Sequence, residues 1–267
     1  MVKKLKIFNN FNIPGKFKKS IILIGNFDGL HSGHQKLFEL AKKYKTKYKS
    51  KIGVVTFDPI PKMFFNTKIK NYRISNFNQK VIYLKKFGVD FVINKKFDKN
   101  FSKITYYKFI KDILSKKLRS KFIFVSNNFR FGHKREGDVA LLKKHEKDFG
   151  YNLINPTPLI KNKEIISSTI IRKLLEEGKL LEANTFLKRN WEIEGKVQRG
   201  RMMGQKIGFP TCNIDIGNYV IAKPGVYAVK TRINDRRKFY KGIANLGYRP
   251  TFNPVSYTHL RAHETEL

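Results

Sequence analysis

The sequence is short of several kinds of residue, and each shortage excludes a class of protein. One cysteine, Cys212, occurs in 267 residues, which excludes an internal disulfide and a four-cysteine zinc site. No apolar run approaches the roughly 20 residues that a membrane-spanning helix needs. The basic N-terminal stretch lacks the continuous apolar segment of a secretory signal. We therefore expect a cytoplasmic protein with no membrane partner.

Acidic residues are also scarce: 20 Asp and Glu stand against 56 Lys and Arg, which gives a formal net charge of +36. Such an excess attracts nucleic acid, anionic lipid or phosphorylated small molecules. The lysines are spread through every segment, as on solvated faces, and no RNA-binding motif is visible. We expect small-molecule substrates and no specific nucleic acid, with a basic nucleic-acid-binding protein on an inactive scaffold as an alternative. The sequence does not indicate an oligomeric state.

The first two-thirds of the chain alternate between strand and helix patterns. Buried-strand patterns cover residues 20–25, 51–57, 89–93 and 121–125. Between them lie helical patterns, such as the one in which Phe77, Val81 and Leu84 share a face. This alternation predicts the α/β class, with crossover connections and a parallel sheet covered on both faces. Ligands of such sheets bind at the carboxyl ends of the strands.

The pattern changes at Asn190, after a short helix. Strand candidates over 191–198, 225–231 and 239–245 are separated by Gly, Pro and Asn turns, without helical periodicity. This texture predicts a small antiparallel barrel or sheet. We place the first domain at residues 1–183 and the second at 184–253.

One constellation follows the strand pattern of residues 20–25 and opens a helix. It reads Gly-Asn-Phe-Asp-Gly-Leu-His-Ser-Gly-His over residues 25–34. Glycines let a phosphate approach the backbone, and a helix N-terminus supplies N–H groups and a positive dipole. His31 and His34, with a glycine between them, can both face one anion and stabilise charge on phosphorus. The alternative is a tight turn with a capping Ser32 and surface histidines.

A second constellation is Ile-Ser-Ser-Thr-Ile-Ile-Arg over residues 166–172. Ser167 or Ser168 can cap a helix, and their hydroxyls, the helix N–H groups and Arg172 can bind phosphate oxygens. Alone the pattern is weak, because such caps are common. Its place after the last strand of the alternating region would bring it to the same sheet edge as His31 and His34.

Together these motifs resemble the nucleotidyltransferase superfamily, and more narrowly the bacterial bifunctional riboflavin kinase/FMN adenylyltransferases (FAD synthetases). The resemblance runs in order from about Ser20 to Phe252. Its further motifs are Thr-Phe-Asp-Pro over 56–59, Asn-Phe-Arg-Phe-Gly over 128–132 with Arg135 and Gly137-Asp138, Gly-Phe-Pro-Thr-Cys-Asn over 208–213, Pro-Gly-Val-Tyr-Ala over 224–228, and residues 242–252. It implies a Rossmann-like parallel-sheet nucleotidyltransferase domain followed by an incomplete antiparallel β-barrel of riboflavin kinase type. A related nucleotidyltransferase with another phosphate acceptor is the nearest enzyme alternative.

The resemblance also implies roles for individual residues in transfer of the adenylyl group of ATP to FMN, with Mg²⁺ present. The residues implied to be catalytic are His31, His34 and Arg172. Those implied to bind ATP or its phosphates are Gly25, Phe27, Asp28, Gly29, Gly33, Ser168 and Thr169. Those implied to bind the flavin are Asn128, Phe129, Arg130, Phe131 and Gly132. In the kinase domain, which phosphorylates riboflavin, Gly208, Pro210, Thr211 and Asn213 would bind ATP and Mg²⁺, with Thr211 as the metal ligand.

The chain departs from the family pattern at several places. Ile60 stands where the family usually has histidine, Ser126 replaces a usual glycine, and Cys212 replaces a usual alanine. After Phe252 the pattern should continue about as far again, but residues 254–267 resemble the in-frame translation of a sequencing adapter. We therefore expect a non-native tail there, a truncated kinase domain, and FMN adenylylation with little or no riboflavin phosphorylation.

Overall fold

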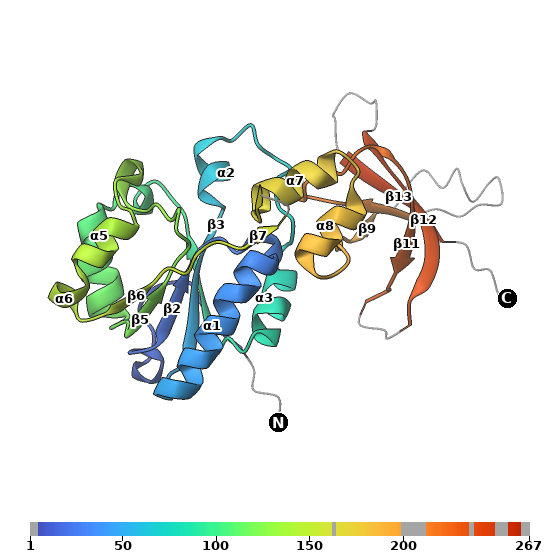
Figure 1. Cartoon of the computed structure of the whole chain (residues 1–267). Helices are drawn as coiled ribbons and strands as arrows, with labels where there is room; N and C mark the ends of the chain where they lie inside the picture. Colours follow the sequence, from blue (N-terminus) through green and yellow to red (C-terminus); the bar gives the residue numbers. More distant parts are fainter. Residues whose placement is uncertain (1–4, 162–163, 199–211, 235–237, 249–255, 263–267) are drawn as a thin grey trace. The chain divides into compact units, whose positions relative to one another are not determined.

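The computed structural model describes residues 5–161, 164–198, 212–234, 238–248 and 256–262. Contacts divide the chain into two compact units (Figure 1). The first unit comprises residues 1–70 and 77–167, and the second comprises residues 71–76 and 168–267. Within the described residues, no helix is long and apolar enough to cross a membrane. By contacts, the second unit takes up the chain at residue 168, before the domain boundary that we expected after residue 183. Residue 183 lies inside a helix of the second unit.

Six parallel strands form the sheet of the first unit, in the order β1-β4-β3-β2-β5-β6. The strands are β1 (Lys6–Phe8), β2 (Ile21–Ile24), β3 (Ile52–Asp58), β4 (Phe91–Lys96), β5 (Phe122–Phe124) and β6 (Asn152–Ile154). The predicted α/β class and parallel sheet are confirmed. The strand expected over 89–93 begins later, at Phe91, because Val89 belongs to the turn that follows Gly88.

Both faces of this sheet are buried, as the uninterrupted apolar runs predict. Alternate residues of β2 enter two different cores: Ile21 and Leu23 one, Ile22 and Ile24 the other. The first core is completed by α1 (Ser32–Tyr48) and α3 (Phe77–Lys86), which cover that face (Figure 1). The second is completed by the π-helix over Phe109–Lys117 and by α5 (Val139–Lys144).

The remaining helices of the first unit are short. They are α2 (Pro61–Phe65), α4 (Tyr106–Lys108), which continues as the π-helix, and α6 (Glu146–Phe149). Thr105 caps α4, since its side chain accepts a hydrogen bond from the Lys108 N–H. The helices α5 and α6 are separated at His145, where the backbone leaves the helical region.

The strand order places a topological switch point between β2 and β5. Successive strands β2, β3 and β4 extend the sheet in one direction, whereas β5 and β6 extend it in the other. Ligands of open parallel sheets bind at the carboxyl ends of the strands where the order reverses. Leu23 pairs with Phe124 at this point, so the loops that begin at Gly25 and Ser126 leave the sheet side by side.

The second unit contains two helices and an antiparallel sheet. The helices are α7 (Ser168–Glu176) and α8 (Leu180–Leu187). The sheet has the order β11-β12-β13-β10-β9, formed by β11 (Gly225–Thr231), β12 (Tyr240–Tyr248), β13 (Ser256–Ala262), β10 (Cys212–Asp215) and β9 (Val197–Gln198). The predicted antiparallel second region is confirmed. β13 falls within the expected non-native tail and pairs with β12 and β10; the origin of these residues stays a prediction.

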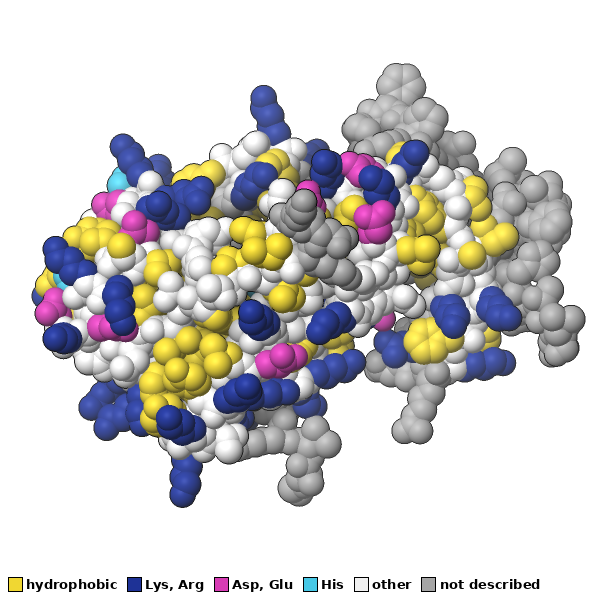
Figure 2. Space-filling model, viewed as in Figure 1, with side chains coloured by type: hydrophobic (Ala, Val, Ile, Leu, Met, Phe, Trp, Pro, Cys, Tyr) yellow, Lys and Arg dark blue, Asp and Glu magenta, His cyan; other side chains and the backbone are white. Residues whose placement is uncertain are grey.

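On one face of the molecule, basic side chains are distributed rather than gathered. On the face shown in Figure 2, Lys and Arg occur over both units with apolar and neutral surface between them. This distribution is typical of solvated lysine faces, and it does not indicate where a functional site lies.

Candidate functional site

The turn after β2, residues 25–34, is called the phosphate loop here. It reverses direction through left-handed backbone at Phe27 (φ 47°), Gly29 (φ 75°) and Leu30 (φ 39°), around a 3₁₀ turn over Asp28–Leu30. A side chain at Gly25 would meet the Phe27 ring at 3.2 Å. The Phe27 ring is buried and lies between the rings of Phe38 and His34, at centroid distances of 5.1 and 5.2 Å. The Phe27 ring, which leaves a left-handed backbone position, thus packs against the His34 ring and supports it.

The two histidines are stacked at the N-terminus of α1. Their ring centroids are 3.7 Å apart with an interplanar angle of 23°. His31 is 5% exposed and caps the helix, because its Nδ1 accepts a hydrogen bond from the His34 N–H at 3.4 Å. An accepting Nδ1 places the proton of a neutral imidazole on Nε2. His31 is therefore held as an Nε2–H donor beside a helix N-terminus.

Gly33 lies between the two histidines in sequence, and its surroundings leave little space for a side chain. A Cβ at this position would lie 3.2 Å from His31 Nδ1 and 3.3 Å from the Ile166 carbonyl oxygen. Ile166 follows the hairpin of β7 (Ile160–Lys161) and β8 (Glu164–Ile165). The second motif, residues 166–172, therefore starts next to the phosphate loop, and α7 begins two residues later at Ser168.

A buried cation lies under the same end of the sheet. Lys80 of α3 is 1% exposed, and its Nζ is 3.3 Å from Thr56 Oγ1. An ammonium group only donates, so Thr56 Oγ1 accepts this hydrogen bond and donates its own hydrogen to the Asn26 carbonyl, also at 3.3 Å. The chain Lys80–Thr56–Asn26 thus fixes the start of the phosphate loop. Lys80 was not among the site residues predicted from the sequence.

The second motif crosses from the first unit to the second, which takes up the chain again at Ser168. Ser168, half-buried, and Thr169, exposed, occupy the first turn of α7. Arg172 is 7% exposed. Its Nε donates to the Tyr72 carbonyl at 2.7 Å, and its guanidinium carbon lies 3.6 Å from the centroid of the Tyr72 ring. The sequence analysis did not single out Tyr72.

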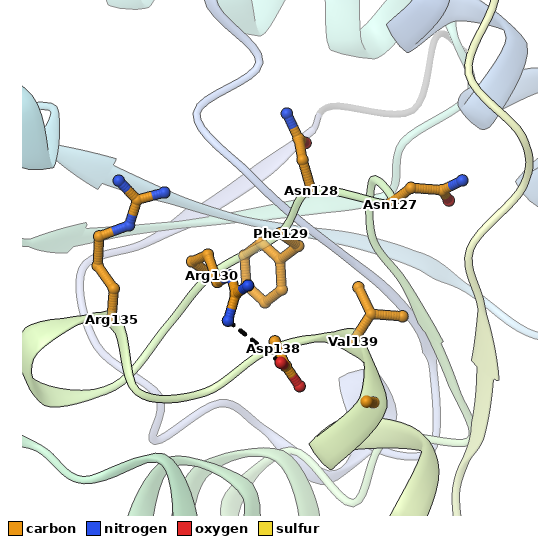
Figure 3. Close-up of a pocket in the computed structure, with 8 residues that line it drawn as sticks. Asn127, Asn128, Phe129, Arg130, Arg135, Asp138 and Val139 are labelled. Carbon is orange, nitrogen blue, oxygen red and sulfur yellow. Dashed lines mark hydrogen bonds and ion pairs between the residues drawn. The ribbon is translucent and has the colours of Figure 1, made fainter.

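A cavity of about 310 Å³ opens after β5 (Figure 3). It is lined by Asn127, Asn128, Phe129, Arg130, Arg135, Asp138, Val139 and Ala140. Arg130 pairs with Asp138 at 3.1 Å, and the other carboxylate oxygen of Asp138 caps α5 by accepting from the Leu141 N–H. Three of the five residues predicted to bind the flavin, Asn128, Phe129 and Arg130, therefore line one cavity.

The other two predicted flavin residues support this loop. Phe131 is buried, and its ring stacks on Phe129 with centroids 5.4 Å apart. Gly132 has φ of 78°, and a Cβ there would lie 2.7 Å from the Tyr106 nitrogen. A Cβ on Gly137 would lie 2.8 Å from both Tyr106 Cβ and the Phe131 ring. Both glycines of this motif are therefore required by close packing against Tyr106.

Two departures from the family pattern have clear surroundings. Ile60 is 3% exposed, which fits an apolar core side chain. Ser126 donates from Oγ to Asn128 Oδ1 at 2.9 Å, so it restrains a residue that lines the cavity. The hydroxyl at this position thus has a definite role that the usual glycine could not fill.

The kinase-type loop is described only at its end. Gly208, Pro210 and Thr211 lie outside the described residues, whereas Asn213 belongs to β10. The Asn213 Oδ1 atom is buried and has no hydrogen-bond partner among the described residues. Burial raises the pKa of the neighbouring Cys212 thiol above its usual value. In the described parts of the chain, no group of three or more His, Cys, Asp or Glu side chains could hold a metal ion.

Comparisons with known proteins agree with this architecture. A family profile described as FAD synthetase matches residues 14–170, and one described as riboflavin kinase matches residues 187–266. The second match includes residues 254–266, which we expected to be a tail. The two profiles leave residues 171–186 between them, and the expected boundary after residue 183 lies there.

Curated relatives extend over most of the chain. The bifunctional riboflavin kinase/FMN adenylyltransferase of Buchnera aphidicola from Acyrthosiphon pisum is 39% identical over 242 residues, covering 91% of this chain and 77% of that protein. The protein of the same name from Escherichia coli K12 is 37% identical over 231 residues, covering 86% and 74%. A solved structure titled macrolide-efflux protein from Streptococcus pneumoniae is 27% identical, with a TM-score of 0.82 over 98% of this chain and 85% of that one.

The fold and the phosphate loop define a nucleotidyltransferase joined to a second, antiparallel domain. The chain belongs to the family of bifunctional riboflavin kinase/FMN adenylyltransferases. It is an enzyme that transfers the adenylyl group of ATP to FMN, giving FAD and pyrophosphate, and a riboflavin kinase domain is present at residues 187–266. Its substrates are ATP and flavins, which are small molecules.

Proposed function

We propose that the phosphate loop binds the triphosphate of ATP and that His31 and His34 stabilise the transition state of adenylyl transfer. The observation that carries this proposal is the stacked histidine pair at the N-terminus of α1, with His31 Nδ1 occupied by the His34 N–H. Oriented N–H donors and a helix N-terminus in a partly buried site favour charge that develops on a phosphoryl group.

The reaction needs positioning rather than a covalent intermediate. A phosphate oxygen of FMN attacks the α-phosphorus of ATP in line, and the bond between the α-phosphorus and the bridging oxygen to the β-phosphorus breaks. The electron pair leaves with pyrophosphate. We assign His31 Nε2 and the helix N–H groups to the transferring phosphate, and Ser168, Thr169 and Arg172 to the departing pyrophosphate.

We assign the cavity of Figure 3 to the flavin. Phe129 offers an aromatic face, and Asn128 and Arg130 offer polar groups within one cavity at the switch point of the sheet. Ligand pockets combine a few placed polar groups with such apolar surface. Arg130 and Arg135 provide positive charge for a phosphorylated flavin.

Mg²⁺ belongs to the proposal for both reactions. Mg²⁺ prefers oxygen ligands and is usually held by substrate phosphates with one or two protein oxygens. The Oδ1 of Asn213, which is buried and has no hydrogen-bond partner in the described part of the chain, fits such an ion in the kinase domain, together with Thr211 as the resemblance implies. When bound, the ion would neutralise charge on the phosphates. In the adenylyltransferase site we assign it to the substrate phosphates.

The experiment is to measure FAD and pyrophosphate from FMN, ATP and Mg²⁺ with the full chain and with His31→Ala. Loss of one positioned donor costs about 10²–10³ in rate. His31→Asn is the matched variant, since its amide can still cap the helix. A His31→Ala enzyme as fast as the unaltered chain would refute the assigned role.

A parallel reaction with riboflavin and ATP tests the kinase domain. Little or no FMN is the prediction from the sequence, and ready formation of FMN would contradict it.

The cytoplasmic location also stays a prediction. Fractionation of cells that express the full chain would check it.

A further inference from the structure

Six residues that lie between α2 and α3 in the chain belong to the second unit. We call residues 71–76 the strap. The Tyr72 and Arg73 N–H groups both donate to the Asn218 carbonyl, at 2.9 and 2.8 Å, and the Val220 N–H donates to the Arg73 carbonyl at 2.8 Å. Arg73 and Tyr219 thus form a parallel β-bridge. The strap is held in the manner of a short strand.

Side chains anchor both ends of the strap to the same unit. Asn71 Nδ2 donates to the Gly217 carbonyl at 2.7 Å, and Trp191 Nε1 donates to the Ile74 carbonyl at 2.9 Å. Asn76 Nδ2 donates to Glu194 Oε2 at 2.9 Å. All the partners on the far side of these bonds lie within residues 187–266, the part that matches riboflavin kinase.

Arg172 is fixed on the strap in a particular orientation. Tyr72 engages it twice, through the hydrogen bond from Nε to the backbone carbonyl and through the ring that covers the guanidinium face. Arginine can bind a phosphate through Nε and one Nη, or end-on through both Nη groups. Because Nε donates to the Tyr72 carbonyl, the mode that uses Nε is not open to a phosphate, and the Tyr72 ring holds the guanidinium plane in one orientation.

We propose that the strap is a positioning element through which the riboflavin kinase domain holds Arg172 for the pyrophosphate of the adenylyltransferase reaction. The inference rests on the role assigned to Arg172 above. Tyr72 acts through Arg172 and touches no reacting atom. Holding a long side chain in its binding orientation reduces the entropy that binding would otherwise cost. The contacts of the strap within the second unit thereby set the affinity of Arg172 for a phosphate product.

The test uses the full chain in the reverse direction, with FAD, pyrophosphate and Mg²⁺ as reactants and ATP as the product measured. Tyr72→Leu removes the ring, whereas Tyr72→Phe keeps both the ring and the backbone carbonyl. A cation–π contact of this kind corresponds to about 3- to 30-fold in an equilibrium constant. We expect Tyr72→Leu to raise the KM for pyrophosphate by that factor and to leave the KM for FAD within about twofold, and Tyr72→Phe to behave as the unaltered chain.

Two further variants separate positioning from folding. In an Arg172→Lys background, Tyr72→Leu should have no additional effect, because a lysine cannot use the stacked face in the same way. Trp191→Phe removes only the donor to Ile74 and should raise the same KM by about two- to fivefold, the worth of one hydrogen bond. Thermal unfolding of each variant is recorded in parallel.

The outcomes are distinguishable. An unchanged KM for pyrophosphate in Tyr72→Leu, an equal rise in the KM for FAD, or full additivity with Arg172→Lys would overturn the inference while the activity stood. If the unaltered chain formed no ATP from FAD and no FAD from FMN, the proposed function and the inference resting on it would both fail.

Discussion

Gly33 provides a test in which stability and activity should change independently. It is the second residue of α1 and has ordinary helical backbone, so alanine there is favoured by up to about 1 kcal/mol of helix propensity. The new methyl group would lie 3.2 Å from His31 Nδ1 and 3.3 Å from the Ile166 carbonyl, whereas comfortable contacts need roughly 3.5–4.0 Å. One of these groups must therefore move by a few tenths of an ångström.

His31 has little freedom to move, because it is 5% exposed and stacked on His34. A misplacement of about 1 Å near reacting groups costs about 10²-fold in rate, so a few tenths should cost about three- to tenfold. We expect Gly33→Ala to unfold at an unchanged or slightly higher temperature and to form FAD about three- to tenfold more slowly.

Gly15→Ala is the matched control, since a Cβ at Gly15 would meet no atom within 4 Å. Its rate of FAD formation should equal that of the unaltered chain. A Gly33→Ala enzyme with full kcat and unchanged KM values would refute the argument that the His31 ring position limits the reaction. A large loss of stability would show instead that the Ile166 carbonyl cannot yield.

Three other predictions concern separate parts of the chain. Thr56→Val breaks the link from the Lys80 ammonium to the phosphate loop, and should lower kcat for FAD formation about tenfold, whereas Thr56→Ser keeps it; equal rates in Val and Ser would exclude the link. Arg130→Ala should raise the KM for FMN several-fold with the KM for ATP unchanged, and stability should change by less than about 1 kcal/mol because the pair with Asp138 is partly exposed. The raised pKa of Cys212 keeps its thiol protonated to higher pH, so iodoacetamide should react more slowly than with a small free thiol at pH 8, by mass spectrometry, and faster as pH rises.

The parts of the fold that the sequence predicted are those with a strong local signal. β2 is a run of four apolar residues followed by glycine, and α1 begins where Ser32 and Gly33 follow a histidine cap. β1 escaped prediction because it has three residues, two of them exposed, and is recruited to the sheet edge by pairing with β4. Its formation depends on a partner more than 80 positions away in sequence, which no local pattern records.

Lys80 shows a different reason for failure. The predicted helix face comprised Phe77, Val81 and Leu84 and did not include Lys80, and lysine is almost never fully buried. Lys80 nevertheless lies three residues after Phe77 and four before Leu84, so it shares their stripe on the helix. This spacing indicates that Lys80 is buried, whereas the general rarity of buried lysines indicates the opposite.

Some parts of the candidate site could be predicted from local sequence, whereas others depend on residues that are distant in sequence. The histidine spacing and the loop after β5 could be read directly, because each motif folds on itself at the end of a strand. Tyr72 could not, because it meets Arg172 from 100 positions away and offers a backbone carbonyl, which any residue type would supply. Only the stacked ring depends on the side chain at that position.

The two compact units of this chain do not have the same bounds as the two family matches, and Arg172 lies in the segment where they differ. The FAD synthetase profile ends at residue 170, three residues into α7, and the riboflavin kinase profile begins at residue 187, so Arg172 and the rest of α7 lie in neither match. Contacts place α7 with the kinase domain, and the strap joins it there although it interrupts the first unit in sequence. If Arg172 binds the leaving pyrophosphate as proposed, it gains from a rigid support, and the backbone hydrogen bonds from Tyr72 and Arg73 to Asn218 provide one that tolerates changes of side chain.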